Sequence, residues 1–231
     1  GISAYPERYV TDRKLPGIID WPPENPDLAA KPGVGVPTHV LSTNCLYYLA
    51  YVIAGEMAAE LGVAGHPSWA KKAMKIKAAI NTQLWNEVKG RYDYLVDPFG
   101  GCDYQEGMGQ SFAVLFGVAD ESLAAKIFQN VYVTPAGIPC VWPSFHRYDT
   151  QNGHGYGRHS GTVWPHIQGF WAHAAAVCEK AHIFAYEMNT LAKHVSRDAQ
   201  FAEIYHPETG EIYGGRQEWK QDDIPPLGQP Q

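Results

Sequence analysis

The chain has 231 residues, of which 45% are hydrophobic, 13% aromatic and 18% charged, a balance that is typical of globular proteins and excludes a disordered chain. Its formal net charge is −6, and no run of lysine or arginine has the density of a phosphate-binding face, so nucleic acid is excluded as a partner. The longest apolar window, CLYYLAYVIAG at 45–55, falls short of the roughly 20 residues that cross a bilayer, which predicts a soluble protein without a membrane span.

The four cysteines, at positions 45, 102, 140 and 178, are far apart and form no C-x-x-C pair. This spacing argues against a zinc knuckle and against a disulfide scaffold, and it predicts buried thiols. The first ten residues, GISAYPERYV, lack the basic start and apolar core of a signal peptide, as would a mature exported chain. The sequence therefore leaves cytoplasmic, periplasmic and secreted locations open.

The predicted elements begin with a proline-rich segment, residues 1–37, which contains LPGIIDWPPENPD and KPGVGVP. Each proline removes an amide donor and clashes with the preceding helical turn, so we expect an ordered loop here. From Ser42 to Leu61 apolar side chains recur every three or four residues and Gly62 supplies a stop, which predicts a helix. The apolar positions are Leu46, Leu49, Ala50, Ile53, Met57 and Leu61.

A second helix is predicted from about Pro67 to Trp85, and the two together would form a helical hairpin. Lysines fall largely on one face of this helix, and an apolar set falls on the other. Next, GRYDYLVD at 90–97 alternates like a short strand between glycines, which predicts a small β excursion. The apolar set of the second helix is Ala73, Ile76, Ile80 and Leu84.

Two more helix pairs follow. The first is predicted at 109–117 and 120–131, with Asp120 as the N-cap of its second helix, and the other at 164–180 and 182–198. Helices therefore come in pairs, joined by short turns on one side and by long loops rich in glycine, proline and aromatics on the other. This pattern predicts an all-α fold of stacked hairpins, which leaves a helical barrel, a solenoid or a bundle open. The long polar-aromatic loops favour the mouth of a barrel that holds a ligand.

Three carboxylates are candidates for acid or base chemistry. Asp20 lies in IIDWPPEN, where an apolar pair and a tryptophan would desolvate it and favour the protonated form of a general acid; a turn aspartate is the alternative. Glu203 lies in FAEIYHPETG between aromatic residues, or else is a helix-end glutamate on a solvated face. Glu106 in DYQEGMG is equally explained as a first-turn glutamate favoured by the helix dipole.

The stretch YGRHSGTVWPHIQGFW, residues 156–171, admits a metal site, a packed helix start or the wall of a sugar pocket. No histidine there has a carboxylate at a recognised metal-ligand spacing, so no metal is expected. Pro165 is well tolerated in a first helical turn, so a packed helix start explains the end of the stretch. Core packing does not explain Tyr156, Arg158 and His159, because they have little apolar surface to bury, and such loops on rigid scaffolds commonly bind ligands.

At this point the sequence resembles a known family. GRHSGTVWPHIQGFWAHAAA at 157–176, read with FAEIYHPETGEIYGG at 201–215, resembles the six-hairpin glycosidases, and most closely the group around mannosylglycerate hydrolases and the processing α-glucosidases of family 63. Three upstream blocks match in order, namely IIDWPPENP, STNCLYYLAYVIAGEMAAELG and GIPCVWPSF. The resemblance covers most of the chain, and its two C-terminal blocks are the specific ones.

The resemblance implies an (α/α)6 toroid whose loops enclose a sugar pocket, with inversion of the anomeric configuration. Asp20 then matches the general acid and Glu203 the general base that activates water. A complete toroid needs well over roughly 300 residues, so residues 1–231 are expected to be one partial catalytic domain with the later three or four hairpins. The remaining hairpins would come from another part of the full-length protein. The residues implied to contact sugar are Trp21, Gln105, Glu106, Tyr156, Arg158, Trp164, His166 and Gln168.

The leading hypothesis is therefore an inverting glycoside hydrolase for an α-linked glucoside or mannoside that needs no cofactor. An α-L-rhamnosidase on the same barrel is a close alternative. A sugar isomerase or epimerase would rely on paired histidines such as His159 and His166 and would leave the glycosidic bond intact. A noncatalytic carbohydrate-binding fragment would bind an oligosaccharide without turnover.

Overall fold

A computed structural model describes residues 38–63, 66–97, 100–144 and 155–213 of the chain. These residues contain six helices in three successive pairs, and each lies within three residues of its predicted bounds. The proline-rich segment 1–37 lies outside the described residues. The pairs are α1 (Leu41–Glu60) with α2 (His66–Gln83), α3 (Gly107–Leu115) with α4 (Glu121–Asn130), and α6 (Pro165–Val177) with α7 (Ala181–Asp198).

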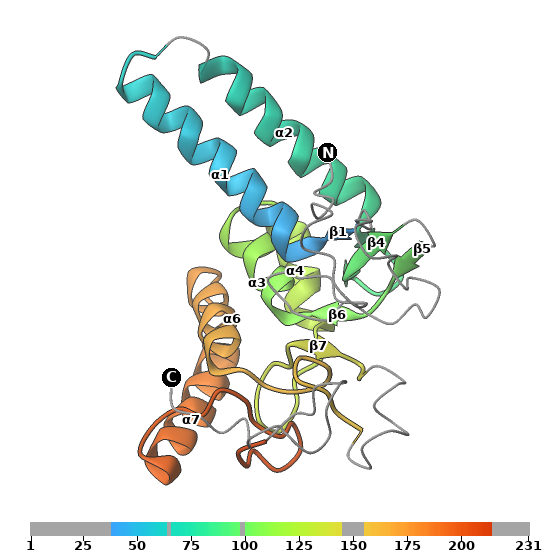
Figure 1. The fold of residues 1–231 in the computed structure, drawn as a ribbon, viewed down its shortest axis with the longest axis vertical. Coiled ribbons are helices and arrows are strands. Elements are labelled where there is room, and N and C mark those ends of the chain that lie inside the picture. Colours follow the sequence, from blue (N-terminus) through green and yellow to red (C-terminus); the bar gives the residue numbers. More distant parts are fainter. Residues whose placement is uncertain (1–37, 64–65, 98–99, 145–154, 214–231) are drawn as a thin grey trace, which may run out of the picture.

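The helix pairs follow one another in space as they do in the chain. Helix α1 packs along α2, and α6 packs along α7, while α3 contacts both α1 and α6. Figure 1 shows α1 and α2 side by side at one end of the molecule, α6 and α7 at the other, and α3 and α4 between them. The predicted hairpins are therefore confirmed for α1 with α2 and for α6 with α7, and α1, α3 and α6 form one row of helices.

Seven strands of two or three residues join these helices within the described residues. The β excursion predicted at 90–97 is confirmed, and the described residues are mostly helical, as the all-α prediction expects. The sequence does not predict the other short strands, because strands of two or three residues give no readable alternation. The antiparallel sets are β1 (His39–Val40), β4 (Leu95–Asp97) and β5 (Gly100–Cys102) in the order β1-β4-β5; β2 (Trp85–Asn86) with β3 (Arg91–Tyr92); and β6 (Gln105–Glu106) with β7 (Val141–Trp142).

Local sequence explains how several helices start and which face they bury. The predicted cap at Asp120 is confirmed, because its carboxylate accepts a hydrogen bond of 2.9 Å from the Leu123 amide. Pro165 is the first residue of α6, where its missing N–H costs no intrahelical bond. The predicted apolar face of the second helix is confirmed at Ala73 and Ile80 of α2 and at Leu84 directly after it, all of which are buried.

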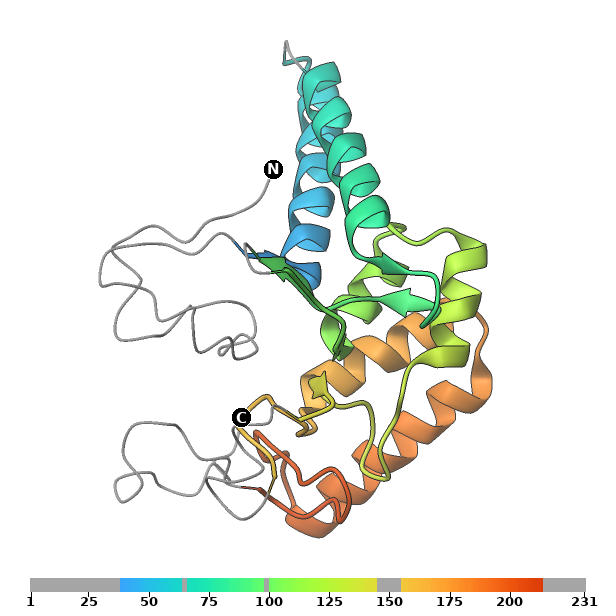
Figure 2. The ribbon, with the colours of Figure 1, turned by 90° about the vertical axis from the view of Figure 1, so that its right-hand side faces the viewer.

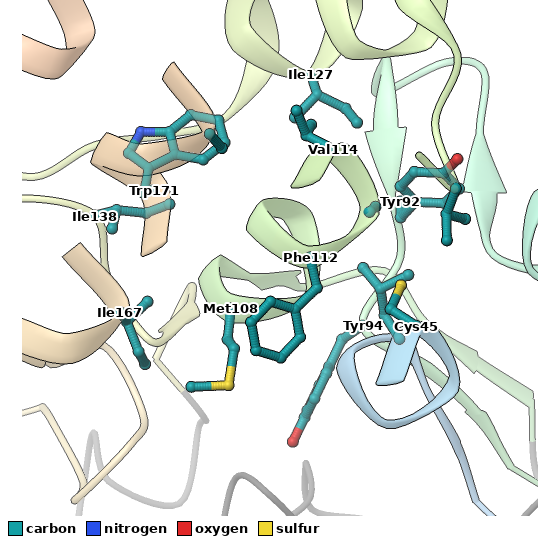
Figure 3. Close-up of a cluster of buried hydrophobic side chains, with 14 of the residues drawn as sticks. Cys45, Tyr92, Tyr94, Met108, Phe112, Val114, Ile127, Ile138, Ile167 and Trp171 are labelled. Atoms are coloured by element: carbon teal, nitrogen blue, oxygen red, sulfur yellow. The ribbon is translucent and has the colours of Figure 1, made fainter. Parts of the chain in front are cut away.

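The core lies where the three pairs meet. Figure 3 shows Phe112 and Met108 of α3 beside Ile167 and Trp171 of α6, with Tyr92, Tyr94 and Cys45 on the other side. The ring of Trp171 lies 4.8 Å from that of Phe128 on α4, so α6 and α4 share one aromatic contact. Helix α3 is consequently buried over nearly its whole length, from Gly107 to Val114.

The two outer pairs leave apolar side chains in solvent. On α1, Ile53, Met57 and Leu61 are 42%, 59% and 75% exposed, although the sequence places them on an apolar helix face. Figure 2 shows α1 and α2 standing away from the rest of the described chain. The α6–α7 pair carries a second exposed set, which consists of Phe170, Val177, Phe184, Met188 and Val195.

All four cysteines are free thiols, as the sequence predicts. Cys45 and Cys140 are buried, and Cys102 and Cys178 are half-buried. Of the helices in the described residues, none combines the length and the apolar character that crossing a membrane requires.

Candidate active site

Three segments beside α6 and α7 form the scaffold of the candidate site. They are residues 134–142, which end in β7, and the loops 155–164 and 201–213, and they lie next to these helices in the lower part of Figure 1. Isolated antiparallel bridges join Pro139 to Val163, Val163 to Tyr205, and Tyr205 to Ile212. Two backbone hydrogen bonds, of 3.1 and 2.8 Å, connect Val163 with Tyr205. The bridges hold the three loops in fixed register, so residues far apart in the chain meet there.

Arg158 and Glu203 form the ion pair of this site. Nη2 of Arg158 lies 2.5 Å from Oε1 of Glu203, and each side chain is 20% exposed. The pair therefore lies at the margin of the solvent, where a substrate could reach it. Within the described residues, Oε2 of Glu203 has no hydrogen-bond partner. The carboxylate thus has one oxygen held by the guanidinium and the other available.

Trp164 fixes the position of Arg158 from two directions. Its indole N–H donates a hydrogen bond of 2.9 Å to the carbonyl oxygen of Arg158. The guanidinium carbon lies 5.6 Å from the centre of the indole ring, which is a cation–π geometry. The hydroxyl of Thr162 donates to the same carbonyl oxygen. These contacts set both the backbone and the charged end of Arg158.

The two histidines predicted at the site have different surroundings. His159 is buried and stacks on Trp164 with ring centres 4.3 Å apart; burial, helped by the charge of Arg158, lowers its pKa to about 3, so it is neutral at pH 7. His166 is exposed and meets the edge of Trp164 at 5.6 Å. Partial desolvation lowers the pKa of His166, and the charge of Glu203 opposes this shift. His166 can therefore donate or accept a hydrogen bond near Glu203.

Tyr156 belongs to an aromatic group at the same end of the molecule. Its ring meets His206 edge-on at 5.1 Å, and its hydroxyl lies 3.5 Å from Oε1 of Glu208. The hydroxyl of Tyr213 donates a hydrogen bond of 2.9 Å to the Tyr156 carbonyl oxygen. This places a half-buried tyrosine ring on the loop that carries Arg158.

Gln105 and Glu106 lie in β6, and both are fully buried. The Gln105 amide bonds the backbone of Tyr132 twice, with its Nε2 donating over 2.9 Å and its Oε1 accepting over 2.7 Å. Oε2 of Glu106 accepts a hydrogen bond of 3.0 Å from the Ser42 amide, and Oε1 accepts one from the Ser42 hydroxyl. Burial raises the pKa of Glu106 to about 8.

These contacts give Gln105 and Glu106 a visible role in the scaffold. Helix α1 has no side-chain cap of its own, and Glu106 at the start of α3 satisfies the amide of Ser42 in its first turn. The Glu106 carboxylate therefore stabilises the first turn of α1 and makes no capping hydrogen bond with α3, the helix that follows it. That Gln105 and Glu106 contact sugar stays a prediction.

Gln168 is fully buried under the loop 134–142. Its Nε2 donates hydrogen bonds of 3.0 Å to the Ala136 carbonyl oxygen and to Oε2 of Glu187. Oε1 of Glu187 accepts one of 3.0 Å from the Ile138 amide, and burial raises the pKa of Glu187 to about 7. Between these bonds lies Gly137 with a φ of 122°, where a Cβ would overlap the Gln168 amide. Contact of Gln168 with sugar also stays a prediction.

Glu187 is the buried group that reasoning from the sequence missed. It is the first of four buried residues on α7, at 187, 190, 191 and 194. Its place on this helical stripe beside Leu191 was a signal for a buried glutamate.

Asp20 and Trp21, the predicted acid and its neighbouring pocket residue, lie outside the described residues, so the separation of the two carboxyls stays a prediction. Within the part of the chain that the structure describes, no three histidine, cysteine or acidic side chains lie close enough together to hold a metal ion.

Comparison with known families gives a match over most of the sequence. The model of the mannosylglycerate hydrolase MGH1-like glycoside hydrolase domain matches residues 35–219. These residues include the Arg158–Glu203 pair and all six described helices. No curated protein gives a significant match.

Solved structures share the fold at low identity. The family 63 mannosylglycerate hydrolase of Thermus thermophilus, in complex with Tris, has a TM-score of 0.59 at 15% identity, over 84% of this chain and 45% of that one. The neutral trehalase Nth1 of Saccharomyces cerevisiae has a TM-score of 0.57 at 12% identity, over 75% and 35%. The family 78 rhamnosidase of Bacillus sp. GL1 has a TM-score of 0.52 at 19% identity, over 78% and 18%. The chain thus spans less than half the length of the Thermus enzyme.

Proposed function

Since the chain belongs to the mannosylglycerate hydrolase MGH1-like glycoside hydrolase domain family, we propose that it carries the catalytic base of an inverting hydrolase for an α-linked glucoside or mannoside. The observation that carries this proposal is the state of Glu203. Arg158 holds one oxygen of Glu203 at 2.5 Å, and the other oxygen has no partner within the described residues. A carboxylate in this state can accept a proton from water.

The reaction uses two carboxyl groups. Glu203 removes a proton from a water molecule while the water oxygen bonds to the anomeric carbon and the glycosidic C–O bond breaks. Asp20 gives its proton to the departing oxygen. The products are an alcohol and a sugar of inverted configuration. For water to fit between them, the two carboxyls need to lie ~6.5–9.5 Å apart.

In this proposal the groups around Glu203 line the sugar pocket. The exposed His166 would hydrogen-bond a sugar hydroxyl, and the aromatic ring of Tyr156 suits the apolar face of a sugar, the role that the resemblance also implies for Trp21. Trp164 and His159, which are stacked and buried, form its floor. For Gln105, Glu106 and Gln168 we propose support of the site from behind instead of direct contact, because each of these side chains hydrogen-bonds buried groups.

Relatives of similar fold support a small α-glycoside as the substrate class. The Thermus mannosylglycerate hydrolase has been solved with glucose and with Tris and D-glycerate. The rhamnosidase match makes an α-L-rhamnoside the second candidate, although it covers only 18% of that enzyme.

We propose further that the described helices are three hairpins of an (α/α)6 toroid. The chain covers 45% of the Thermus enzyme, and apolar side chains are exposed at both ends of the row of helices. Three further hairpins, from the same protein or from another chain, would cover these two ends. The predicted partial domain is consistent with this arrangement.

The test is hydrolysis of an activated α-glycoside by the complete protein, with the product anomer followed by proton NMR. Asp20→Asn and Glu203→Gln should each lower kcat by about 100-fold or more with unchanged circular dichroism. Glu211→Gln, an exposed glutamate of the same loop as Glu203, serves as the matched control and should keep the wild-type rate.

Three outcomes would decide against the proposal or part of it. A wild-type rate in Glu203→Gln or Asp20→Asn removes that residue from catalysis. A product in which the glycosidic bond is intact and the sugar is isomerised favours the isomerase. Calorimetric binding of an oligosaccharide without turnover favours a noncatalytic binding domain.

A further inference from the structure

The ion pair at the candidate site is asymmetric. A guanidinium commonly binds a carboxylate through two parallel hydrogen bonds. Here only Nη2 of Arg158 bonds Glu203, and only through Oε1. A second hydrogen bond to Oε2 would occupy the oxygen that the proposed reaction needs, so the single bond has a chemical consequence.

The position of Arg158 is set by groups other than Glu203. Trp164 holds its carbonyl oxygen and lies under its guanidinium, and Thr162 donates to the same oxygen. The Nε of Arg158 is buried without a hydrogen-bond partner. The arginine is thus held in place by Trp164 and Thr162 of its own loop.

Glu203 is also attached to this loop through its neighbours in the chain. Ile204 and Tyr205 are fully buried, and Tyr205 exchanges two backbone hydrogen bonds with Val163. The backbone at 203 therefore keeps its place relative to Arg158, and only the side-chain torsions of Glu203 are left to be fixed. The 2.5 Å contact to Arg158 is what fixes them.

We infer that Arg158 is the positioning residue of Glu203: it holds Oε1 so that Oε2 faces the water that attacks the sugar. This inference rests on the proposed function and adds a residue that acts through the base. The guanidinium takes no part in bond making or bond breaking. Removing it leaves a flexible glutamate whose reactive oxygen points toward the water for only part of the time.

The kinetic test uses the complete protein with Arg158→Gln and Arg158→Lys. We expect Arg158→Gln to lower kcat by about 100-fold with KM within about threefold, because ground-state binding is kept while the base is misplaced. Arg158→Lys should recover part of the loss, since it keeps the charge without the planar fork of donors. In a Glu203→Gln background, Arg158→Gln should add no further loss, because residues that act as a unit are not additive.

Arg197 supplies a matched control. It pairs with Asp198 at 2.6 Å, and its guanidinium carbon lies 5.8 Å from the ring of Tyr205, so it repeats the chemistry of Arg158 away from Glu203. Arg197→Gln should leave kcat and KM unchanged. Circular dichroism and thermal unfolding of all variants show which of them fold. If Arg158→Gln does not fold, Arg158→Lys is used for the test in its place.

Two kinds of result would contradict the positioning role of Arg158. A raised KM with unchanged kcat, or full additivity with Glu203→Gln, would overturn positioning and make Arg158 a sugar ligand only. If the wild-type protein hydrolyses no glycoside, the proposed function fails, and a crystal structure of the Arg158 variant then decides the inference alone. There, a Glu203 carboxylate that stays in its wild-type orientation would overturn it, whereas a rotated or dispersed carboxylate would support it.

Discussion

Helices α3 and α1 are both rich in apolar residues, yet they differ in how much of that surface is buried. Helix α3 is buried from Gly107 to Val114, because α1 packs on one side of it and α6 on the other. Helix α1 is buried at its first turns and at Ala58, and it exposes Ile53 and Met57. Neighbours, more than local sequence, therefore decide which apolar helix becomes core. The uncovered side of α1 is where we propose that further hairpins pack.

The largest expected effect comes from truncating one side chain of each helix. Phe112 of α3 is 5% exposed and contacts Phe116 and Phe170, so Phe112→Ala should lower the free energy of unfolding by about 3–5 kcal/mol. Met57→Ala on α1 should change it by less than roughly 0.5 kcal/mol. Urea denaturation of the 231-residue chain measures both.

The same pair of variants tests closure of the toroid. In the complete protein, where we propose that other hairpins cover α1, Met57→Ala should cost about 2 kcal/mol or more. An unchanged value there would show that α1 remains uncovered and would remove the contrast between the two helices.

The second expected effect is the dependence of stability on pH. It depends on two buried carboxyls, Glu106 at the junction of α1 with α3 and Glu187 under the loop 134–142. Burial raises the pKa of Glu106 to about 8 and that of Glu187 to about 7, so the folded state favours their protonated forms. The two glutamates contribute their full stability below a pH of about 4.5, which is their pKa in the unfolded chain. That contribution is lost as the pH rises through their folded pKa values of about 7 and about 8. The shift in pKa between the unfolded and the folded state corresponds to roughly 5 kcal/mol for Glu106 and roughly 3 kcal/mol for Glu187. His159, with its pKa lowered to about 3, acts oppositely and loses stability as pH falls below 6.5.

The contribution of these three groups to stability should therefore be greatest near about pH 4.5, where the two glutamates begin to ionise in the unfolded chain, and fall on both sides, which chemical denaturation at a series of pH values would show. Glu106→Gln and Glu187→Gln should flatten the alkaline side, and His159→Asn the acid side. If the free energy of unfolding changes with pH equally in all variants and the wild type, these three groups do not control the pH dependence of stability.

The smallest expected effect is a difference in stability between alanine substitutions at two glycines on neighbouring helices. On α3, a Cβ at Gly109 would lie 2.7 Å from a methyl carbon of Leu41 and overlap Glu106, so Gly109→Ala should cost about 1–3 kcal/mol. On α6, a Cβ at Gly169 would meet no atom within 4 Å, so Gly169→Ala should stabilise by about 0.5–1 kcal/mol. Thermal unfolding measures both, and a stabilising Gly109→Ala would mean that α1 and α3 are not closely packed.

Much of the helical layout could be predicted because its signals are local. Apolar spacing on α2 and the cap at Asp120 each lie within a few residues of the structure that they specify. The exposure of Ile53 could not be predicted from that spacing, because it depends on which helices lie beside α1. The spacing of apolar residues identifies the apolar face of a helix but not the element that packs against this face.

For the candidate site, sequence motifs predict residues but not the contacts between them. Arg158 and Glu203 were both singled out from their motifs, but their pairing joins positions 45 residues apart. Glu106 illustrates the same limit more strongly, because Ser42, which it bonds, is 64 residues away. Such pairs depend on tertiary packing, and no pattern within one segment records them.

The position of Trp164 has a consequence for the order in which the site is assembled during synthesis. Arg158 leaves the ribosome 45 residues before Glu203, and at ~5–20 residues per second this interval is roughly 2–9 s. Trp164 follows Arg158 by six residues, so its indole can hold the guanidinium while the carboxylate is still untranslated. The ion pair then forms after the contacts of Arg158 with Trp164 and Thr162, on an arginine that is already in place.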